Sequence, residues 1–126
     1  MVAVLSLSIA VCAASLAKAA SMPQTVVFFT PWSALVDDAA GQAISTAAQQ
    51  AKASAGASVV VTGYADTTGG VAANRLLSMT RAQVVVDALE ADGVAATRIR
   101  RKAAGRTPAV NTTLESRRVT IAIGGN

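Results

Sequence analysis

The chain has 126 residues, which is enough for one domain with its own hydrophobic core. Hydrophobic residues make up 52% of the sequence, aromatic residues only 3%, and the formal net charge is +4. Because there is no histidine and only one cysteine, a His-based catalytic pair, an internal disulfide and a thiolate metal cluster are excluded. We expect no cofactor and no metal.

Residues 1–19 are predicted to be a signal peptide. An apolar run from Val2 to Leu16 is followed by small residues at Ala17 and Ala19, a pattern typical of secretory cleavage. The run is shorter than the roughly 20 residues of a membrane-spanning helix. No Lys or Arg precedes it, and Cys12 lies in a weak resemblance to a lipidation site, so cleavage, lipidation and retention as an anchor stay open. A core helix of a cytoplasmic domain is the alternative to export. The expected folded domain covers residues 20–126.

The exported part divides into four strands and two helices. Runs of β-branched and aromatic residues predict strands, and alanine-rich stretches with an acidic start or a terminal glycine predict helices. In chain order, we expect a strand at Thr25–Phe29, a helix from about Asp37 to Ala53, a strand at Ser58–Gly63, a helix at Val71–Asp92, and strands at Arg98–Ala104 and Arg118–Ile123. This order predicts an α+β fold, a βαβαββ sandwich with both helices on one face of a mixed four-stranded sheet.

A charged residue falls on the expected core-facing side of the second helix. At 100° per residue, Arg81 lies in the middle of an apolar arc, with Leu76 and Val86 pointing elsewhere. The arc consists of Leu77, Val84, Val85 and Ala88. A guanidinium in such a place costs free energy unless it is paired and hydrogen-bonded. Asn74 and Ser78 lie at the edge of the arc, toward the preceding loop.

That preceding loop carries Asp66, which together with Arg81 and Asn74 would complement a zwitterion. A carboxylate attracts an ammonium group, and a guanidinium binds a carboxylate bidentately. Gly69 and Gly70 would let the backbone approach a ligand closely. In the alternative, purely structural interpretation, Asp66 braces its loop and Arg81 pairs with it or with a carbonyl to lock the helix against the sheet.

Four sequence blocks occur in a specific order and spacing: TGYADTTG at 62–69, NRLLS at 74–78, TRA at 80–82 and SRRVTI at 116–121. Together they closely resemble the OmpA-like C-terminal domain family, which includes the tail of outer-membrane protein A, the peptidoglycan-associated lipoprotein and the MotB periplasmic domain. The segment Val26–Leu35 is similar to the opening strand and turn of that family. The resemblance therefore extends from Thr25 to Ile123.

The resemblance implies noncovalent binding of peptidoglycan, through the diaminopimelate of the stem peptide. It implies a cell-envelope protein of a Gram-negative-type bacterium, located in the periplasm or associated with the outer membrane. By position, the implied ligand-binding residues are Asp66 for the ammonium, Arg81 for the carboxylate, Asn74 for the ligand backbone and Arg117 from the last strand, with Thr67 and Gly69 in the supporting loop. The chain departs from the family pattern at three rim positions, where Tyr64 replaces a histidine, Thr30 an acidic residue and Ser116 an asparagine.

Three other functions are alternatives to wall binding. Catalysis would need a carboxylate pair or a Ser-Lys arrangement, and no motif provides either, so we do not expect an enzyme.

The cations Arg98, Arg100, Arg101, Lys102 and Arg106 could neutralise phosphates. No aromatic residues are interleaved with them to stack on bases, so nucleic acid is not an expected partner, and a solvated strand edge is the simpler interpretation. The third alternative is a module that binds other envelope proteins with the same fold but without wall binding. Membrane contact is expected only through an N-terminal anchor.

Overall fold

The structure is a computed structural model that describes residues 24–65, 69–106 and 116–124. Its elements are β1 (Gln24–Phe28), α2 (Asp38–Ala53), β2 (Val59–Ala65), α3 (Val71–Ala91), a 3-10 turn η1 (Ala96–Arg98), β3 (Ile99–Arg106) and β4 (Arg118–Ile123). The predicted βαβαββ order is confirmed. The predicted signal peptide lies outside the described residues.

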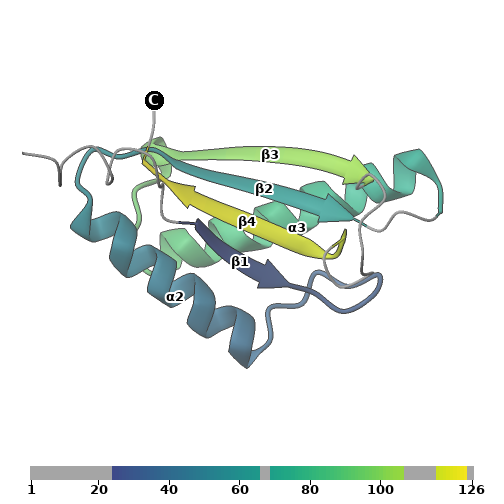
Figure 1. Ribbon diagram of the computed structural model, residues 1–126, viewed down its shortest axis with the longest axis horizontal. Coiled ribbons are helices and arrows are strands. Elements are labelled where there is room, and N and C mark those ends of the chain that lie inside the picture. Colours follow the sequence, from purple (N-terminus) through teal and green to yellow (C-terminus); the bar gives the residue numbers. More distant parts are fainter. Residues whose placement is uncertain (1–23, 66–68, 107–115, 125–126) are drawn as a thin grey trace, which may run out of the picture.

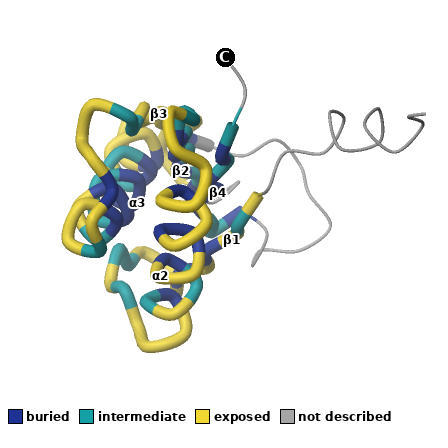
Figure 2. Tube along the Cα trace, turned by 90° about the vertical axis from the view of Figure 1, so that its left-hand side faces the viewer, coloured by how far each residue is buried: buried dark blue, intermediate teal, exposed yellow. Residues whose placement is uncertain are grey.

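The strands form one mixed sheet in the order β1-β4-β2-β3. β4 is antiparallel to both β1 and β2, whereas β2 and β3 are parallel. A parallel pair needs a crossover connection, and α3 supplies it. α3 runs behind the sheet in Figure 1, and Figure 2 shows α2 and α3 together on one side of the strands. The predicted arrangement of helices on one face is therefore confirmed.

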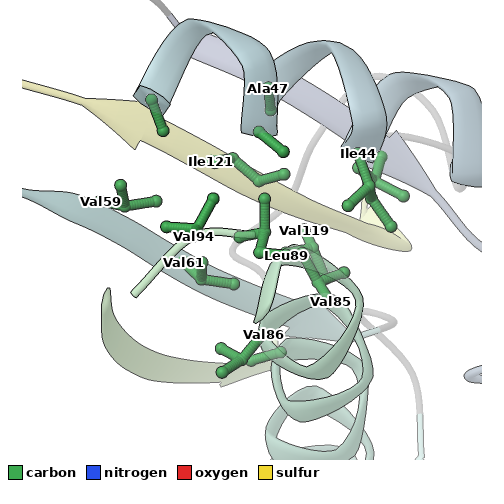
Figure 3. Packing of buried hydrophobic residues seen from close by; sticks show 14 of the residues in the cluster. Ile44, Ala47, Val59, Val61, Val85, Val86, Leu89, Val94, Val119 and Ile121 are labelled. Carbon is green, nitrogen blue, oxygen red and sulfur yellow. The ribbon is translucent and has the colours of Figure 1, made fainter. Parts of the chain in front are cut away.

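The core lies between this helical layer and the sheet. Every second residue of β2 from Val59 to Ala65 is buried, as expected when successive side chains point to opposite faces. Val61 and Ile121 from the sheet belong to the same buried cluster as Ile44 of α2 and Leu89 of α3 (Figure 3). Most of the cluster is Ala or Val, so the helices can approach the sheet closely.

The start of α2 and the end of α3 lie at residues that the sequence marks. The Oδ1 of Asp37 accepts a hydrogen bond from the Ala40 amide at 2.8 Å and caps the start of α2. Gly93, with φ +100°, follows α3, and the amide of Val94 donates to the Leu89 carbonyl at 3.0 Å. This left-handed glycine cap confirms the predicted end of the second helix.

The buried face of α3 begins with polar residues. Asn74, Ser78 and Arg81 are fully buried. The apolar part of the same face consists of Ala82, Val85, Val86 and Leu89. The prediction that Val86 points elsewhere is wrong, since it is only 8% exposed. The polar residues occupy the first half of this face, so an arc drawn through apolar residues alone is rotated away from the true one.

Helix α3 packs unusually close to β2 at Gly63. A Cβ added there would lie 2.0 Å from the carbonyl oxygen of Ser78, so only glycine fits. The Ser78 hydroxyl accepts a hydrogen bond from the Gly105 amide at 2.9 Å and donates to the Arg75 carbonyl at 2.8 Å. α3 is thus fixed against β2 by contact and against β3 by a hydrogen bond.

Candidate binding site

Arg81 is the centre of the candidate site. Its side chain has no exposed surface, and it is the largest fully buried side chain of the described residues. Nε donates to the Ser33 carbonyl at 2.8 Å, Nη1 to the Tyr64 carbonyl at 3.1 Å and Nη2 to the Thr30 carbonyl at 3.0 Å. The guanidinium carbon also lies 5.5 Å from the centroid of the Phe29 ring.

These three bonds connect two segments that are distant in the sequence. Thr30 and Ser33 belong to the turn that follows β1, and Tyr64 lies near the end of β2. A buried charge is tolerated when several polar atoms satisfy it, and main-chain carbonyls do so here. Arg81 therefore holds the turn after β1 against the end of β2. Its partner in β2, Tyr64, comes two residues before Asp66 in the chain.

The turn after β1 has an uncommon backbone. The Ser33 amide donates to the Thr30 carbonyl at 3.2 Å, which closes a four-residue turn around Pro31 and Trp32. Trp32 has φ +54°, the only positive φ among the described non-glycine residues. A third turn position with positive φ favours Gly or Asn, so a tryptophan there costs about 1–3 kcal/mol.

Trp32 meets the loop that precedes α3. A Cβ added to Gly69, which has φ +90°, would lie 3.0 Å from Cη2 of Trp32 and 3.3 Å from Nδ2 of Asn74. The same Nδ2 donates to the Gly70 carbonyl at 2.9 Å. The indole, Gly69 and the Asn74 amide are therefore neighbours.

Arg117 approaches from the residue before β4. Its Nε donates to the Phe29 carbonyl at 3.2 Å, and its own carbonyl accepts from the Phe29 amide at 2.9 Å. Of the three departures from the family pattern, Ser116 is fully buried and Thr30 supplies a carbonyl to Arg81. Tyr64 lies under Arg118, whose guanidinium carbon is 4.0 Å from the ring centroid.

The structure thus gathers Arg81, Asn74, Gly69 and Arg117 around the segment Phe29–Ser33. Asp66 and Thr67 lie outside the described residues, so their predicted part in the site stays a prediction. Sequence reasoning assigned no role to Trp32. The available signal was a lone tryptophan directly after a proline, at the end of a strand.

Arg98 does not belong to an open basic patch. Its Nε donates to the Ala57 carbonyl at 3.0 Å, and its Nη2 donates to the carbonyls of Ala51 at 2.7 Å and Ser54 at 2.9 Å. These carbonyls lie at and just beyond the end of α2, where a cation is favoured by the helix dipole. Arg98 is therefore a helix cap.

The basic residues of β3 itself differ in their surroundings. Arg101 bonds through Nη1 to Oε1 of Gln83 on α3. Arg100 and Lys102 are exposed on this edge strand of the sheet, and the side chain of Arg106 is outside the described part. The arrangement fits the interpretation of solvated charges that protect a sheet edge.

Two further findings apply to the described ranges alone. They contain no group of three His, Cys, Asp or Glu side chains placed to hold a metal ion. None of their helices combines the length and apolar character needed to cross a membrane.

The βαβαββ fold, with a buried arginine that joins the turn after β1 to the end of β2, defines a small α+β domain. The chain belongs to the OmpA family, whose model matches residues 28–120. Domains of this family are generally non-enzymatic, are found in the periplasmic cell envelope and are generally associated with peptidoglycan binding. No curated protein sequence matches the chain.

Solved structures share the fold. The peptidoglycan-associated lipoprotein of Burkholderia pseudomallei has a TM-score of 0.73 at 23% identity, over 79% of this chain and 89% of that one. The OmpA-like domain of FopA1 from Francisella tularensis has a TM-score of 0.70 at 26% identity, over 79% and 70%. The periplasmic domain of Helicobacter pylori MotB has a TM-score of 0.68 at 21% identity, over 79% and 71%.

Proposed function

We propose that this chain binds peptidoglycan noncovalently, through the diaminopimelate of the stem peptide. The proposed site lies where the turn after β1 meets Gly69, just before α3. Asp66 holds the ligand ammonium, Arg81 attracts the carboxylate, Asn74 supports the ligand backbone and Arg117 contacts it. Thr67 and Gly69 shape the loop. Membership of a family associated with peptidoglycan binding supports this proposal.

The observation that carries the proposal is the position of Arg81. A full positive charge is fixed in a buried place by the carbonyls of Thr30, Ser33 and Tyr64. Charges interact more strongly near a protein interior than in water, so a nearby carboxylate is attracted without reorganisation of the arginine. Since Arg81 has no exposed surface, direct contact requires the ligand to displace a covering group, whereas the attraction itself requires no displacement.

Pelleting with purified sacculi tests the proposal. Asp66→Asn removes the charge proposed to hold the ammonium while keeping the side-chain shape. Losing a charge-assisted hydrogen bond costs about 1.5–3 kcal/mol, so affinity should fall about ten- to a hundredfold. Glu90→Gln on the exposed side of α3 is the matched control, because it makes the same charge change far along the helix from Asn74.

Sacculi with lysine in place of diaminopimelate lack the second carboxylate and should bind the wild type weakly. An equal loss for Glu90→Gln and Asp66→Asn would contradict a specific site and indicate general electrostatics. A folded wild type that stays in the supernatant with both kinds of sacculi would favour the alternative function, a module that binds other envelope proteins.

We also propose that residues 1–19 are an export signal. Mass spectrometry of the N-terminus of protein made in a Gram-negative host checks this. Cleavage after Ala19 gives one mass, a lipid on Cys12 another, and a retained anchor a third. An unprocessed chain found in the cytoplasm would contradict export.

A further inference from the structure

Trp32 is an exposed aromatic residue beside the site, and the proposed function leaves it without a role. It is the only tryptophan of the chain, and it is 60% exposed. An exposed tryptophan gains little from burial, and this one also occupies a left-handed backbone position that favours glycine. The outlier therefore calls for a functional explanation.

The surrounding contacts hold the indole in a fixed place. The carbonyls on either side of Pro31 and Trp32, those of Thr30 and Ser33, both accept hydrogen bonds from Arg81. The end of the six-membered ring rests against Gly69, where a Cβ would lie 3.0 Å from Cη2. A fixed aromatic surface thus stands at the edge of the candidate site.

The location of this surface relates it to the proposed ligand. The indole and the Asn74 amide both lie against Gly69, and Asn74 is the residue proposed to support the ligand backbone. In a peptidoglycan stem peptide, two residues separate the diaminopimelate from the lactyl group of the amino sugar. A stem peptide that runs past Asn74 toward its sugar therefore brings the sugar beside the indole.

We propose that Trp32 forms a platform for the amino sugar that carries the stem peptide. A pyranose ring has one face of C–H groups and a polar rim, and an indole offers a flat apolar face with one N–H donor at its edge. The methyl and methylene groups of the peptide need no such flat surface. The inference rests on the proposed function, because it places the sugar relative to diaminopimelate.

Two soluble ligands separate this inference from the function beneath it. One is the disaccharide-tripeptide that contains diaminopimelate, and the other is the free tripeptide released from it by an amidase. An aromatic contact of this type corresponds to about a three- to tenfold gain in affinity. We expect the wild type to bind the disaccharide-tripeptide tighter by that factor, and the fluorescence of Trp32 to change with this ligand alone.

Trp32→Gly is the informative variant, because glycine adopts the positive φ without strain and the fold should be at least as stable. It should bind the two ligands equally, at the affinity of the wild type for the free tripeptide. Trp32→Phe, which retains a ring, should keep part of the preference. The unfolding midpoint of each variant shows whether the fold is intact.

The results that would overturn the inference are distinct from those that would overturn the proposed function. Equal binding of both ligands by the wild type, or an equal loss for both ligands in Trp32→Gly, would overturn the sugar platform and leave diaminopimelate binding intact. Binding of neither ligand by the folded wild type would overturn the proposed function and the platform with it.

Discussion

Two arginines at separate places in the fold each bind three main-chain carbonyls. They differ in whether these carbonyls lie at the end of one helix or in two separate segments of the chain. Arg98 is half-buried and satisfies the end of one helix, so the fold alone explains it. Arg81 is fully buried and joins the turn after β1 to the end of β2. No helix terminus requires a cation there. The same chemistry thus serves the fold in one region and organises a candidate site in the other.

The largest expected effect follows from removing the buried guanidinium. Arg81→Ala leaves the carbonyls of Thr30, Ser33 and Tyr64 without these donors, and it opens a cavity. We expect a loss of about 3–5 kcal/mol in the free energy of unfolding, measured in urea. Sacculus binding should be lost as well. A loss below about 1 kcal/mol would show that Arg81 does not hold the two segments together.

Gly63→Ala should cause the next largest loss of stability, because it displaces α3, which carries Arg81. The surroundings of Arg98 should not change. The added Cβ would collide with the Ser78 carbonyl oxygen at 2.0 Å. Overpacking of this kind costs about 1–3 kcal/mol. Thermal unfolding measures the cost, and Gly41→Ala, where a Cβ meets only Cγ1 of Val36 at 4.0 Å and φ is not left-handed, is the control without overpacking. Equal losses for the two variants would contradict the close approach of α3.

Arg98→Ala is the direct counterpart of Arg81→Ala. The hydrogen bond to the Ser54 carbonyl is exposed and those to Ala51 and Ala57 are part-buried, so water can replace part of what the guanidinium supplies. We expect a loss of about 1–2 kcal/mol and unchanged sacculus binding. If this variant lost binding while remaining folded, the separation between a structural and a functional arginine would be wrong.

Arg117→Ala should cause the smallest loss of stability of these variants. Its side chain contributes one hydrogen bond of 3.2 Å, to the Phe29 carbonyl. The free energy of unfolding should fall by about 0.5–1 kcal/mol, by chemical denaturation. If Arg117 also contacts the ligand, binding should weaken by more than this loss explains. Binding that is unchanged would remove Arg117 from the site and leave Arg81 in it.

The fold was largely readable from the sequence, because alternation, helix caps and turn residues agreed with each other. The ends of the strands were harder to predict. β2 continues beyond Gly63 to Ala65 and β3 continues beyond Ala104 to Arg106, because the two strands pair with each other over these residues. The burial of Arg81 was also foreseen from its position on the helix.

The hydrogen-bond partners of Arg81 could not be predicted from the sequence. Arg81 and Arg98 bond to main-chain carbonyls at sequence separations of 17 to 51 residues, and every residue type carries the same carbonyl. Residue identity therefore gives no signal for such bonds. For the same reason the sequence groups Arg98 with the exposed cations of β3, and it gives no role to Trp32 within the turn that Val26–Leu35 predicts.

The close seating of α3 on β2 has a consequence for recognition. With Gly63 against the helix backbone and the Ser78 hydroxyl tied to β3, the helix has no slack along the sheet. The residues that α3 contributes to the proposed site, Asn74 and Arg81, are therefore held in place by the fold itself. Association need not be slowed by rearrangement of this helix, and little conformational entropy is lost in ordering it.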